Sequence, residues 1–269
     1  MTRVYTLVNQ KGGVGKTTTA INLGAYLSYF GQRVLLVDID PQANTTSSLG
    51  IDKYHVKAGT YQCLVGQATA SSAILHNPKL KISLLPSSPS LAGAEIELVD
   101  VEKREEKLNN VLAPILDRYD YILIDCPPSL GLLTLNGLIS AKDGLIIPVQ
   151  CEYLALEGLG QLTQTITKVH TSLYPDLHIR GVVLTMFDTR TKLSSDVVAE
   201  VKRVFPNKVF TSIIPRSIRL AEAPSYGLPV SHYAPESSAA KAYSALALEL
   251  LQQDGIEAVY PEIMQMERG

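Results

Sequence analysis

The sequence of 269 residues contains little cysteine, no tryptophan and no marked excess of charge of either sign. Its three cysteines have no C-x-x-C spacing, which argues against a disulfide framework or a cysteine zinc site and favours a reducing compartment. Its five histidines are scattered and form no metal-ligand motif. No apolar run reaches the roughly 18 residues of a membrane span, and the first residues resemble a strand rather than a signal peptide. These absences predict a cytoplasmic globular protein that does not use a membrane.

The charge balance excludes one way of binding nucleic acid. With 24 Lys and Arg against 26 Asp and Glu, the formal charge is −2, which is incompatible with permanent coating of DNA by bulk positive charge. The charge is unevenly distributed, however. Residues 180–219 hold eight basic and three acidic side chains, a local excess of +5, whereas residues 95–106 are acidic. On charge alone, the basic window favours a solvated surface over a binding face.

Apolar runs that alternate with helical patterns predict a doubly wound α/β fold, with a mostly parallel sheet and helices on both faces. Strands are predicted at residues 4–8, 34–37, 82–85, 121–124, 145–149 and 182–186. Helices are predicted from about residue 20 to Gly31 and at 91–112, 159–173 and 239–250, with shorter elements at 61–65 and 71–75. No linker or internal repeat divides the chain. We therefore expect a single domain spanning residues 1–269, in which 254–269 form a short C-terminal tail.

The most specific motif is Lys11-Gly-Gly-Val-Gly-Lys16-Thr17-Thr18, between the first strand and the first helix. Glycines allow the backbone to curl so that several N–H groups face phosphate oxygens, and the helix N-terminus adds positive potential. Lys16 is expected to reach the β- and γ-phosphates, and the Thr17 hydroxyl to ligate Mg²⁺. Gln10 replaces the first glycine of the usual pattern. The alternative, a glycine-rich turn without a ligand, is disfavoured because the strand and the helix lie where phosphate binding requires them.

Three acids end predicted strands close to this loop in the expected fold. Asp125 ends the strand 121–124, and Asp38 and Asp40 follow the strand 34–37. Because the carboxyl ends of parallel strands share one crevice, the three carboxylates are expected to converge on the phosphate loop. Asp125 could hold the hydration shell of Mg²⁺. For one of the other two acids, capping of the turn before Pro41 remains an alternative.

Several segments together resemble the ParA/Soj ATPases, the chromosome- and plasmid-partitioning members of the deviant Walker-A phosphate-loop group. The resemblance rests on KGGVGKTT, VDIDPQANTT and YILIDCPPSLGLLT, and it continues through TMFDTRTKLS and IPRSIRLAEAPSYGLPV. It covers nearly the whole chain in the family's order. It implies binding of ATP and Mg²⁺, an ATP-dependent sandwich homodimer, slow hydrolysis, and association with non-specific double-stranded DNA and with a ParB-type centromere-binding protein.

The resemblance also implies individual roles. Lys11 matches the signature lysine that reaches phosphates bound by the other subunit, Gly12 the glycine at that interface, and Asp40 the acid that assists the attacking water. The implied catalytic residues are Lys11, Lys16 and Asp40. The expected metal ligands are Thr17 and Asp125, which the resemblance also implies, and Asp38, which the convergence of the strand-end acids places beside them. The implied ATP contacts are Lys11, Gly12, Gly13, Val14, Gly15, Lys16, Thr17, Thr18, Asp40, Asp125, Met186, Pro215 and Arg216. The DNA contacts expected from the basic window are Arg190, Lys192, Lys202, Arg203 and Arg219, and the resemblance implies such a role for Arg190 and Arg219.

Slow hydrolysis is also expected from the residues themselves. No glutamine or glutamate is obviously placed as a strong general base, and an aspartate is ordinarily too acidic to abstract a proton well at neutral pH. Because the ATPase pattern begins within about five residues of Met1, no helix-turn-helix segment is expected before it, which favours non-specific contacts to the DNA backbone. Such a protein would be cytoplasmic and associated with the nucleoid when ATP-bound.

Three alternatives remain at this stage. A MinD-like division-site ATPase would need a basic amphipathic C-terminal helix, whereas this C-terminus is acidic and interrupted by Pro261. An iron–sulfur relative would need cysteines at a subunit interface, and Cys126 is more typical of a buried thiol. A nucleotide-dependent DNA scaffold that does not hydrolyse ATP would share most of these features.

Overall fold

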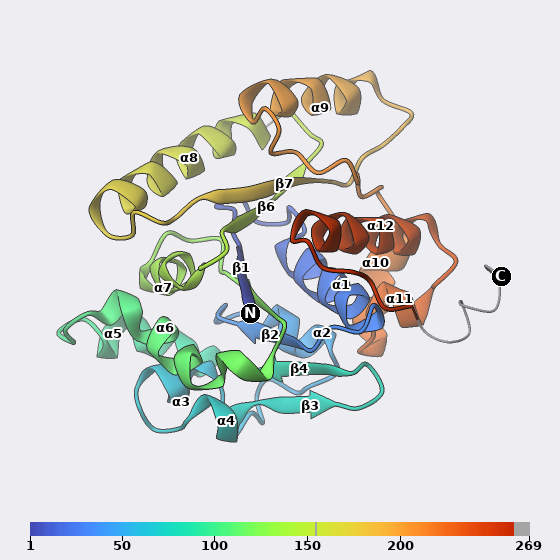
Figure 1. The fold of residues 1–269 in the computed structure, drawn as a ribbon. Coiled ribbons are helices and arrows are strands. Elements are labelled where there is room, and N and C mark those ends of the chain that lie inside the picture. Colours follow the sequence, from blue (N-terminus) through green and yellow to red (C-terminus); the bar gives the residue numbers. More distant parts are fainter. Residues whose placement is uncertain (154, 261–269) are drawn as a thin grey trace.

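The computed structural model describes residues 1–153 and 155–260. In these residues one seven-stranded sheet forms the centre of the molecule, in the order β3-β4-β2-β5-β1-β6-β7 (Figure 1). Its strands are β1 (Arg3–Leu7), β2 (Val34–Asp38), β3 (Leu75–Asn77), β4 (Ile82–Leu85), β5 (Tyr121–Asp125), β6 (Leu145–Gln150) and β7 (Ile179–Thr185). Neighbouring strands are parallel except for β3, which runs antiparallel to β4 at the edge.

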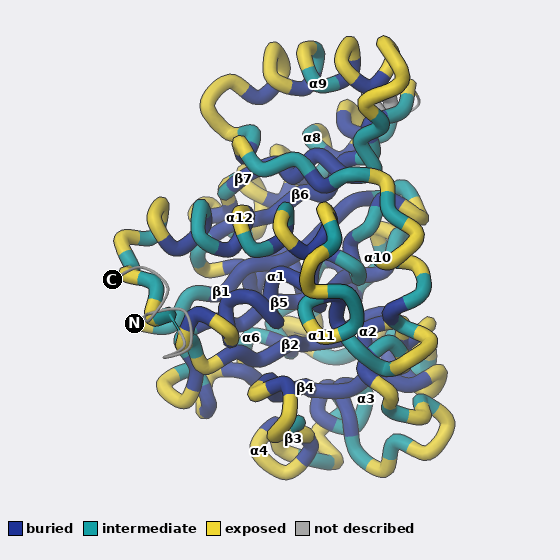
Figure 2. Tube along the Cα trace, turned by 90° about the vertical axis from the view of Figure 1, so that its right-hand side faces the viewer, coloured by how far each residue is buried: buried dark blue, intermediate teal, exposed yellow. Residues whose placement is uncertain are grey.

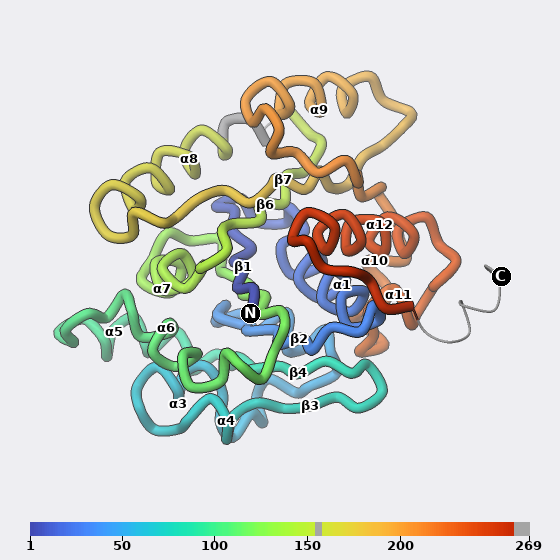
Figure 3. Tube along the Cα trace, viewed as in Figure 1, coloured from blue at the N-terminus to red at the C-terminus, as the bar shows by residue number. Residues whose placement is uncertain are grey.

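Helices cover both faces of the sheet, so the predicted doubly wound α/β fold is confirmed (Figure 1). The longer helices are α1 (Lys16–Tyr29), α7 (Leu132–Ser140), α8 (Ala155–Ser172), α9 (Lys192–Val204) and α12 (Ser238–Gln253). The shorter ones are α2 (Asn44–Ser48), α3 (Thr60–Leu64), α4 (Ala70–Ala73), α5 (Ala94–Glu97), α6 (Lys107–Leu112), α10 (Ile218–Glu222) and α11 (Val230–Tyr233). Helices α1 and α12, from opposite ends of the chain, lie side by side on one face (Figure 3).

The strands in the middle of the sheet are buried throughout, as Figure 2 shows. Every residue of β2 and of β5 is buried, which explains why their sequences are continuous apolar runs that end in an aspartate. Along these two strands Asp38 lies directly opposite Asp125. The fold therefore brings two carboxylates to the same edge of the sheet as the loop that follows β1. No helix in the described part of the chain is long and apolar enough to cross a bilayer.

One predicted element is wrong. Residues 91–112 were expected to form one charged helix, but they form short pieces: a 3-10 turn over Pro89–Gly93, α5, a second 3-10 turn over Arg104–Glu106, and α6. Lys103, between α5 and the second 3-10 turn, has a φ of 53°, a left-handed conformation that a continuous α-helix does not contain. The Asn136 side chain on α7 accepts a hydrogen bond from Leu108 N (2.9 Å) and donates one to Arg104 O (2.9 Å). These contacts replace the helical bonds that a continuous helix would make.

The other predicted elements are observed within a few residues of their expected bounds. Strand β7 begins at Ile179 and ends at Thr185, so Met186 lies beyond the strand. Strand β3 and helices α2, α7, α9, α10 and α11 were not predicted. Of the predicted tail 254–269, residues 261–269 lie outside the described part. Val259 N, just before them, donates a hydrogen bond to Phe30 O (3.2 Å) at the end of α1.

Candidate nucleotide site

The glycine-rich loop connects β1 to α1 and has the backbone geometry that only glycine adopts readily. Gly13 and Gly15 have φ values of 74° and 89°, in the left-handed region, and α1 begins directly afterwards at Lys16. The Thr185 hydroxyl at the end of β7 donates a hydrogen bond to Val14 O (2.8 Å). The loop is thereby fixed to the sheet with the N-terminus of a 14-residue helix behind it, an arrangement suited to an anion.

Lys16 lies inside this loop. It is 7% exposed, and its Nζ donates to Lys11 O at 3.4 Å. Burial lowers the pKa of its ammonium group, while the nearby carboxylates of Asp125 and Asp40 act in the opposite direction. Among the described residues no carboxylate lies within ion-pair distance of Lys16. A buried cation without an ion-pair partner is complementary to a phosphate group.

Asp125 faces the loop from the end of β5 and is 1% exposed. Its Oδ2 accepts two hydrogen bonds of 2.7 Å, one from the Thr17 hydroxyl and one from the Thr45 hydroxyl. Its Oδ1 is buried and has no hydrogen-bond partner in the described part of the chain. A buried carboxylate oxygen without a donor is costly unless another group satisfies it.

Asp38 and Asp40 are buried beside Asp125, at 0% and 5% exposure. Asp38 accepts hydrogen bonds from the Thr46 hydroxyl (2.7 Å), Thr46 N (2.9 Å) and Asp40 N (3.2 Å). Asp40 Oδ1 accepts one from Gln42 N (2.9 Å). The three strand-end acids therefore lie together next to the phosphate loop. The oxygens of Asp38 already have donors within the protein, so its part as a metal ligand stays a prediction.

The electrostatics of this cluster favour a cation. Burial raises the pKa of Asp125 to about 6, and burial followed by repulsion from Asp125 raises that of Asp38 to about 7. No group of three or more His, Cys, Asp or Glu residues in the described part of the chain could by itself enclose a metal. Mg²⁺ binds in the way that this site allows, through one or two carboxylates, a hydroxyl, water and substrate phosphates. The donor set and the free Asp125 Oδ1 therefore fit Mg²⁺.

The three residues predicted to contact adenine lie on two adjacent segments. Met186 has φ 53° immediately after β7, and beyond it Phe187 forms a bridge with Pro215. Arg216 N donates to Phe187 O (2.9 Å), and the Arg216 guanidinium pairs with Glu152 at 2.8 Å. The structure thus brings Met186, Pro215 and Arg216 near one another. Their contact with a base stays a prediction.

The five predicted DNA contacts are all exposed, and they lie on or just before α9 and on α10, two helices that Figure 2 labels. Lys192, Lys202 and Arg203 lie on α9, Arg190 precedes α9, and Arg219 lies on α10. The three arginines make ion pairs with acids close to them in sequence: Arg190 with Asp188 (2.7 Å), Arg203 with Glu200 (2.6 Å) and Arg219 with Glu222 (2.8 Å). Their positive charge is therefore partly compensated in the single chain.

Sequence reasoning missed the hydroxyl donors that surround the acids. Thr45 and Thr46, both 0% exposed on α2, contact Asp125 and Asp38 respectively. Ser87 N donates to Thr46 Oγ1 (2.8 Å), and Ser87 Oγ donates to Asp40 O (2.7 Å). The pair of threonines directly after VDIDPQAN was the available signal, because buried carboxylates need donors.

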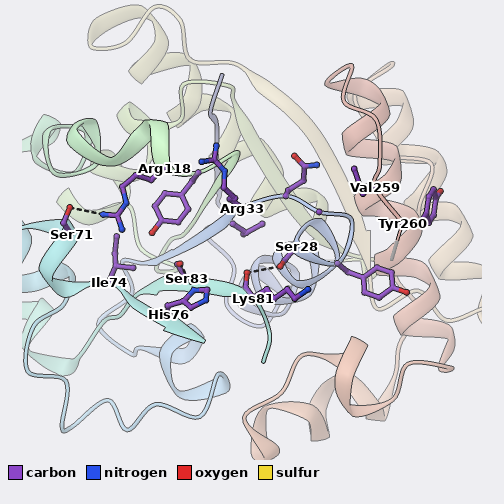
Figure 4. A pocket seen from close by; sticks show the side chains of 15 residues that line it. Ser28, Arg33, Ser71, Ile74, His76, Lys81, Ser83, Arg118, Val259 and Tyr260 are labelled. Carbon is purple, nitrogen blue, oxygen red and sulfur yellow. Dashed lines mark hydrogen bonds between the residues drawn. The ribbon is translucent and has the colours of Figure 1, made fainter. Parts of the chain in front are cut away.

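A cavity of about 690 Å³ lies elsewhere, beside the first residues of β2 and β4 (Figure 4). The Arg118 guanidinium reaches Ser71 there (3.1 Å), and Ser28 Oγ donates to Lys81 O (2.9 Å). The cavity lies at the edge of the sheet opposite to the acids, and none of the predicted site residues line it. It is therefore separate from the nucleotide site.

The glycines with positive φ form a loop that leads directly into a helix. This loop lies beside a threonine–aspartate pair, at the edge of the sheet where the parallel strands end. Together these features define a phosphate-loop nucleotide-binding protein. Comparisons with known proteins narrow this class. Residues 2–179 match a family model described as an AAA domain. The sporulation initiation inhibitor protein Soj of Bacillus subtilis is 52% identical over 93% of this chain and 98% of its own. The chromosome-partitioning ATPase Soj of Treponema pallidum is 50% identical over 95% and 99%. The chain belongs to the ParA/Soj family of partitioning ATPases.

Solved structures support the same fold. One is cobyrinic acid a,c-diamide synthase from Mycobacterium smegmatis with an ATP analogue and magnesium, 39% identical, with a TM-score of 0.83 over 97% of this chain and all of that one. Another is the septum site-determining protein MinD from Pyrococcus horikoshii with Mg-ADP, 28% identical, with a TM-score of 0.75 over 95% and 98%. Both of these neighbours hold an adenine nucleotide and magnesium.

Proposed function

We propose that this chain is a DNA-partitioning ATPase whose single domain, residues 1–269, binds ATP with Mg²⁺ at the loop between β1 and α1. The observation that carries the proposal is the Thr17–Asp125 hydrogen bond of 2.7 Å, beside a buried Asp125 oxygen that has no donor. Partitioning as the biological role is supported by the names of the Soj and ParA relatives, which are 49% to 52% identical to this chain over nearly its whole length.

Each side chain at the loop has a separable task. The backbone N–H groups of residues 12–18 and the Lys16 ammonium would bind the β- and γ-phosphates, and Thr17 and Asp125 would hold Mg²⁺. Mg²⁺ supplies charge neutralisation on the phosphates when it is bound. Met186, Pro215 and Arg216 line the adenine. The buried position of Lys16 strengthens its attraction to phosphate because less water screens it.

Asp40 orients the attacking water. Its backbone and side chain are fixed by hydrogen bonds with Ser87 Oγ and Gln42 N, so its carboxylate is rigidly placed. An aspartate orients a water more readily than it deprotonates one at neutral pH, so basal hydrolysis is slow. Slow basal turnover leaves room for stimulation by a ParB-type partner and by DNA.

Dimerisation completes the site. Gly12 is exposed, and a Cβ added to it would meet no atom within 4 Å in the single chain. Lys11 is half-buried beside it and forms no ion pair with any described residue. Both positions are therefore open toward a second subunit, where Lys11 reaches the phosphates bound by its partner.

The ATP-bound dimer binds non-specific double-stranded DNA through the exposed basic residues of the 190–219 region. One such region contacts few phosphates, and two on one dimer raise the affinity by avidity. ATP-bound protein therefore associates with the nucleoid in the cytoplasm, and hydrolysis stimulated by a ParB-type protein releases it.

The test is DNA binding by the purified protein with ATP, with ADP and without nucleotide, alongside phosphate release. We expect the protein to retain DNA with ATP but not with ADP or without nucleotide. We also expect slow phosphate release by the wild type and none by Asp40→Ala. Equal DNA binding in all three states contradicts the proposed switch. If the wild type releases no phosphate and Asp40→Ala binds DNA as the wild type does, the protein is a non-hydrolysing scaffold instead. If the protein pellets with liposomes only when ATP is present, the MinD-like alternative is correct.

A further inference from the structure

Two hydroxyl donors share one oxygen of Asp125. Thr17, at the start of α1, and Thr45, on α2, each donate to Oδ2 at 2.7 Å, while Oδ1 has no donor in the described residues. The phosphate-loop pattern accounts for Thr17 but does not require Thr45. The carboxylate is held by both hydroxyls through the same oxygen, so its second oxygen remains the one available to a ligand.

The segment that carries Thr45 is fixed on several sides. Ala43, directly before α2, is fully buried with φ 52°, a conformation that an alanine adopts only when its surroundings impose it. Thr46 donates through its hydroxyl to Asp38 and accepts from Ser87 N in the loop after β4. Thr45 itself is 0% exposed. Its hydroxyl is therefore held rigidly against Asp125.

We propose that Thr45 is a positioning residue for Mg²⁺ at the proposed nucleotide site. By holding Oδ2, Thr45 fixes the rotation of the Asp125 carboxylate about χ2 and keeps Oδ1 free to accept a hydrogen bond from metal-bound water. Groups that orient a metal's ligands in this way commonly contribute about 10- to 100-fold to metal affinity. The inference rests on the proposed function, because it assumes that Mg²⁺ and ATP bind beside Asp125.

A purely structural role for Thr45 makes a different prediction. If the hydroxyl only stabilised α2, its removal would weaken ATP binding to the same extent with and without Mg²⁺. If Thr45 orients Asp125, its removal acts only through the metal. The Mg²⁺ dependence of nucleotide affinity therefore separates the two roles without any measurement of turnover.

The experiment titrates a fluorescent ATP analogue into the full chain at a series of Mg²⁺ concentrations and in EDTA. Thr45→Val, which keeps the shape of the side chain but removes the donor, is expected to raise the Mg²⁺ concentration for half-maximal binding about 10- to 100-fold. Affinity in EDTA is expected to stay unchanged. Thr45→Ser, which retains a hydroxyl, is expected to restore the wild-type Mg²⁺ dependence.

Thr6→Val is the matched control. Thr6 is also 0% exposed, but its hydroxyl donates to Gly137 O (2.6 Å) rather than to an acid, so the same substitution should leave the Mg²⁺ dependence unchanged. If Thr45→Val does not fold, as judged by circular dichroism, Thr45→Ala removes the same donor without a bulky replacement. An unchanged Mg²⁺ dependence, or an equal loss of affinity in EDTA, overturns the inference. Absence of Mg²⁺-dependent binding in the wild type instead contradicts the proposed function.

Discussion

The buried carboxylate of Asp38 makes the stability of the ligand-free protein depend on pH. Its pKa in the folded state is raised to about 7, so the folded state binds a proton that the unfolded state releases near pH 4. Stability therefore falls as pH rises from about 4 to about 7 and levels off above that. In Asp38→Asn, the difference in the free energy of unfolding between pH 5 and pH 8 is expected to be smaller than in the wild type by on the order of 2 kcal/mol. Urea unfolding at both pH values in EDTA, without nucleotide, measures it.

Asp117→Asn is the control, because Asp117 is exposed on the surface and lies outside the acid cluster. The free energy of unfolding of Asp117→Asn should change with pH as it does in the wild type. The stability of Asp38→Asn should still fall to some extent as pH rises, because burial also raises the pKa of Asp125 to about 6. Wild-type stability that increases from pH 5 to pH 8 would contradict the protonation assigned to these two groups.

Among the elements, α7 organises the broken segment 89–112. Asn136 is 1% exposed, and its side chain hydrogen-bonds with the backbone groups Leu108 N and Arg104 O. Asn136→Ala leaves both backbone groups without these partners, at a cost of about 2 kcal/mol in the free energy of unfolding. Urea unfolding measures the loss, and hydrogen exchange should accelerate at residues 104–108. Asn110→Ala, at an exposed position of α6, should leave both quantities near the wild-type values.

The same segment shows what sequence patterns can and cannot predict. The strands were predictable because β2 and β5 are covered on both faces, which requires apolar runs that end where the site begins. The phosphate loop was predictable because its left-handed turns require glycine. The break within 91–112 was not, because Asn136, which stabilises it, is distant in sequence. Thr45 was missed for the same reason, since its partner Asp125 is 80 residues away.

At the scale of the whole molecule, the proposed function makes DNA binding depend on charge and oligomeric state together. The chain carries a formal charge of −2, and the arginines predicted to contact DNA are paired with acids. A single chain should therefore hold DNA weakly, and an ATP-bound dimer that presents two basic regions should hold it well. Under this proposal a nearly neutral protein would bind DNA reversibly, and we expect its DNA affinity to fall steeply with added salt.

Arg219→Glu tests this account on the whole protein. The substitution reverses one charge in each half of the dimer and places a second carboxylate three residues before Glu222, so ATP-dependent DNA affinity should fall at least about tenfold. ATP affinity should not change, because Arg219 is exposed and is not among the residues proposed to contact ATP. Lys142→Glu makes the same change in charge at an exposed position just before β6, outside residues 190–219, and should bind DNA like the wild type. If both variants lose DNA affinity equally, net charge governs binding rather than the region containing Arg219. If Arg219→Glu binds DNA with unchanged affinity, α10 is not part of the DNA contact.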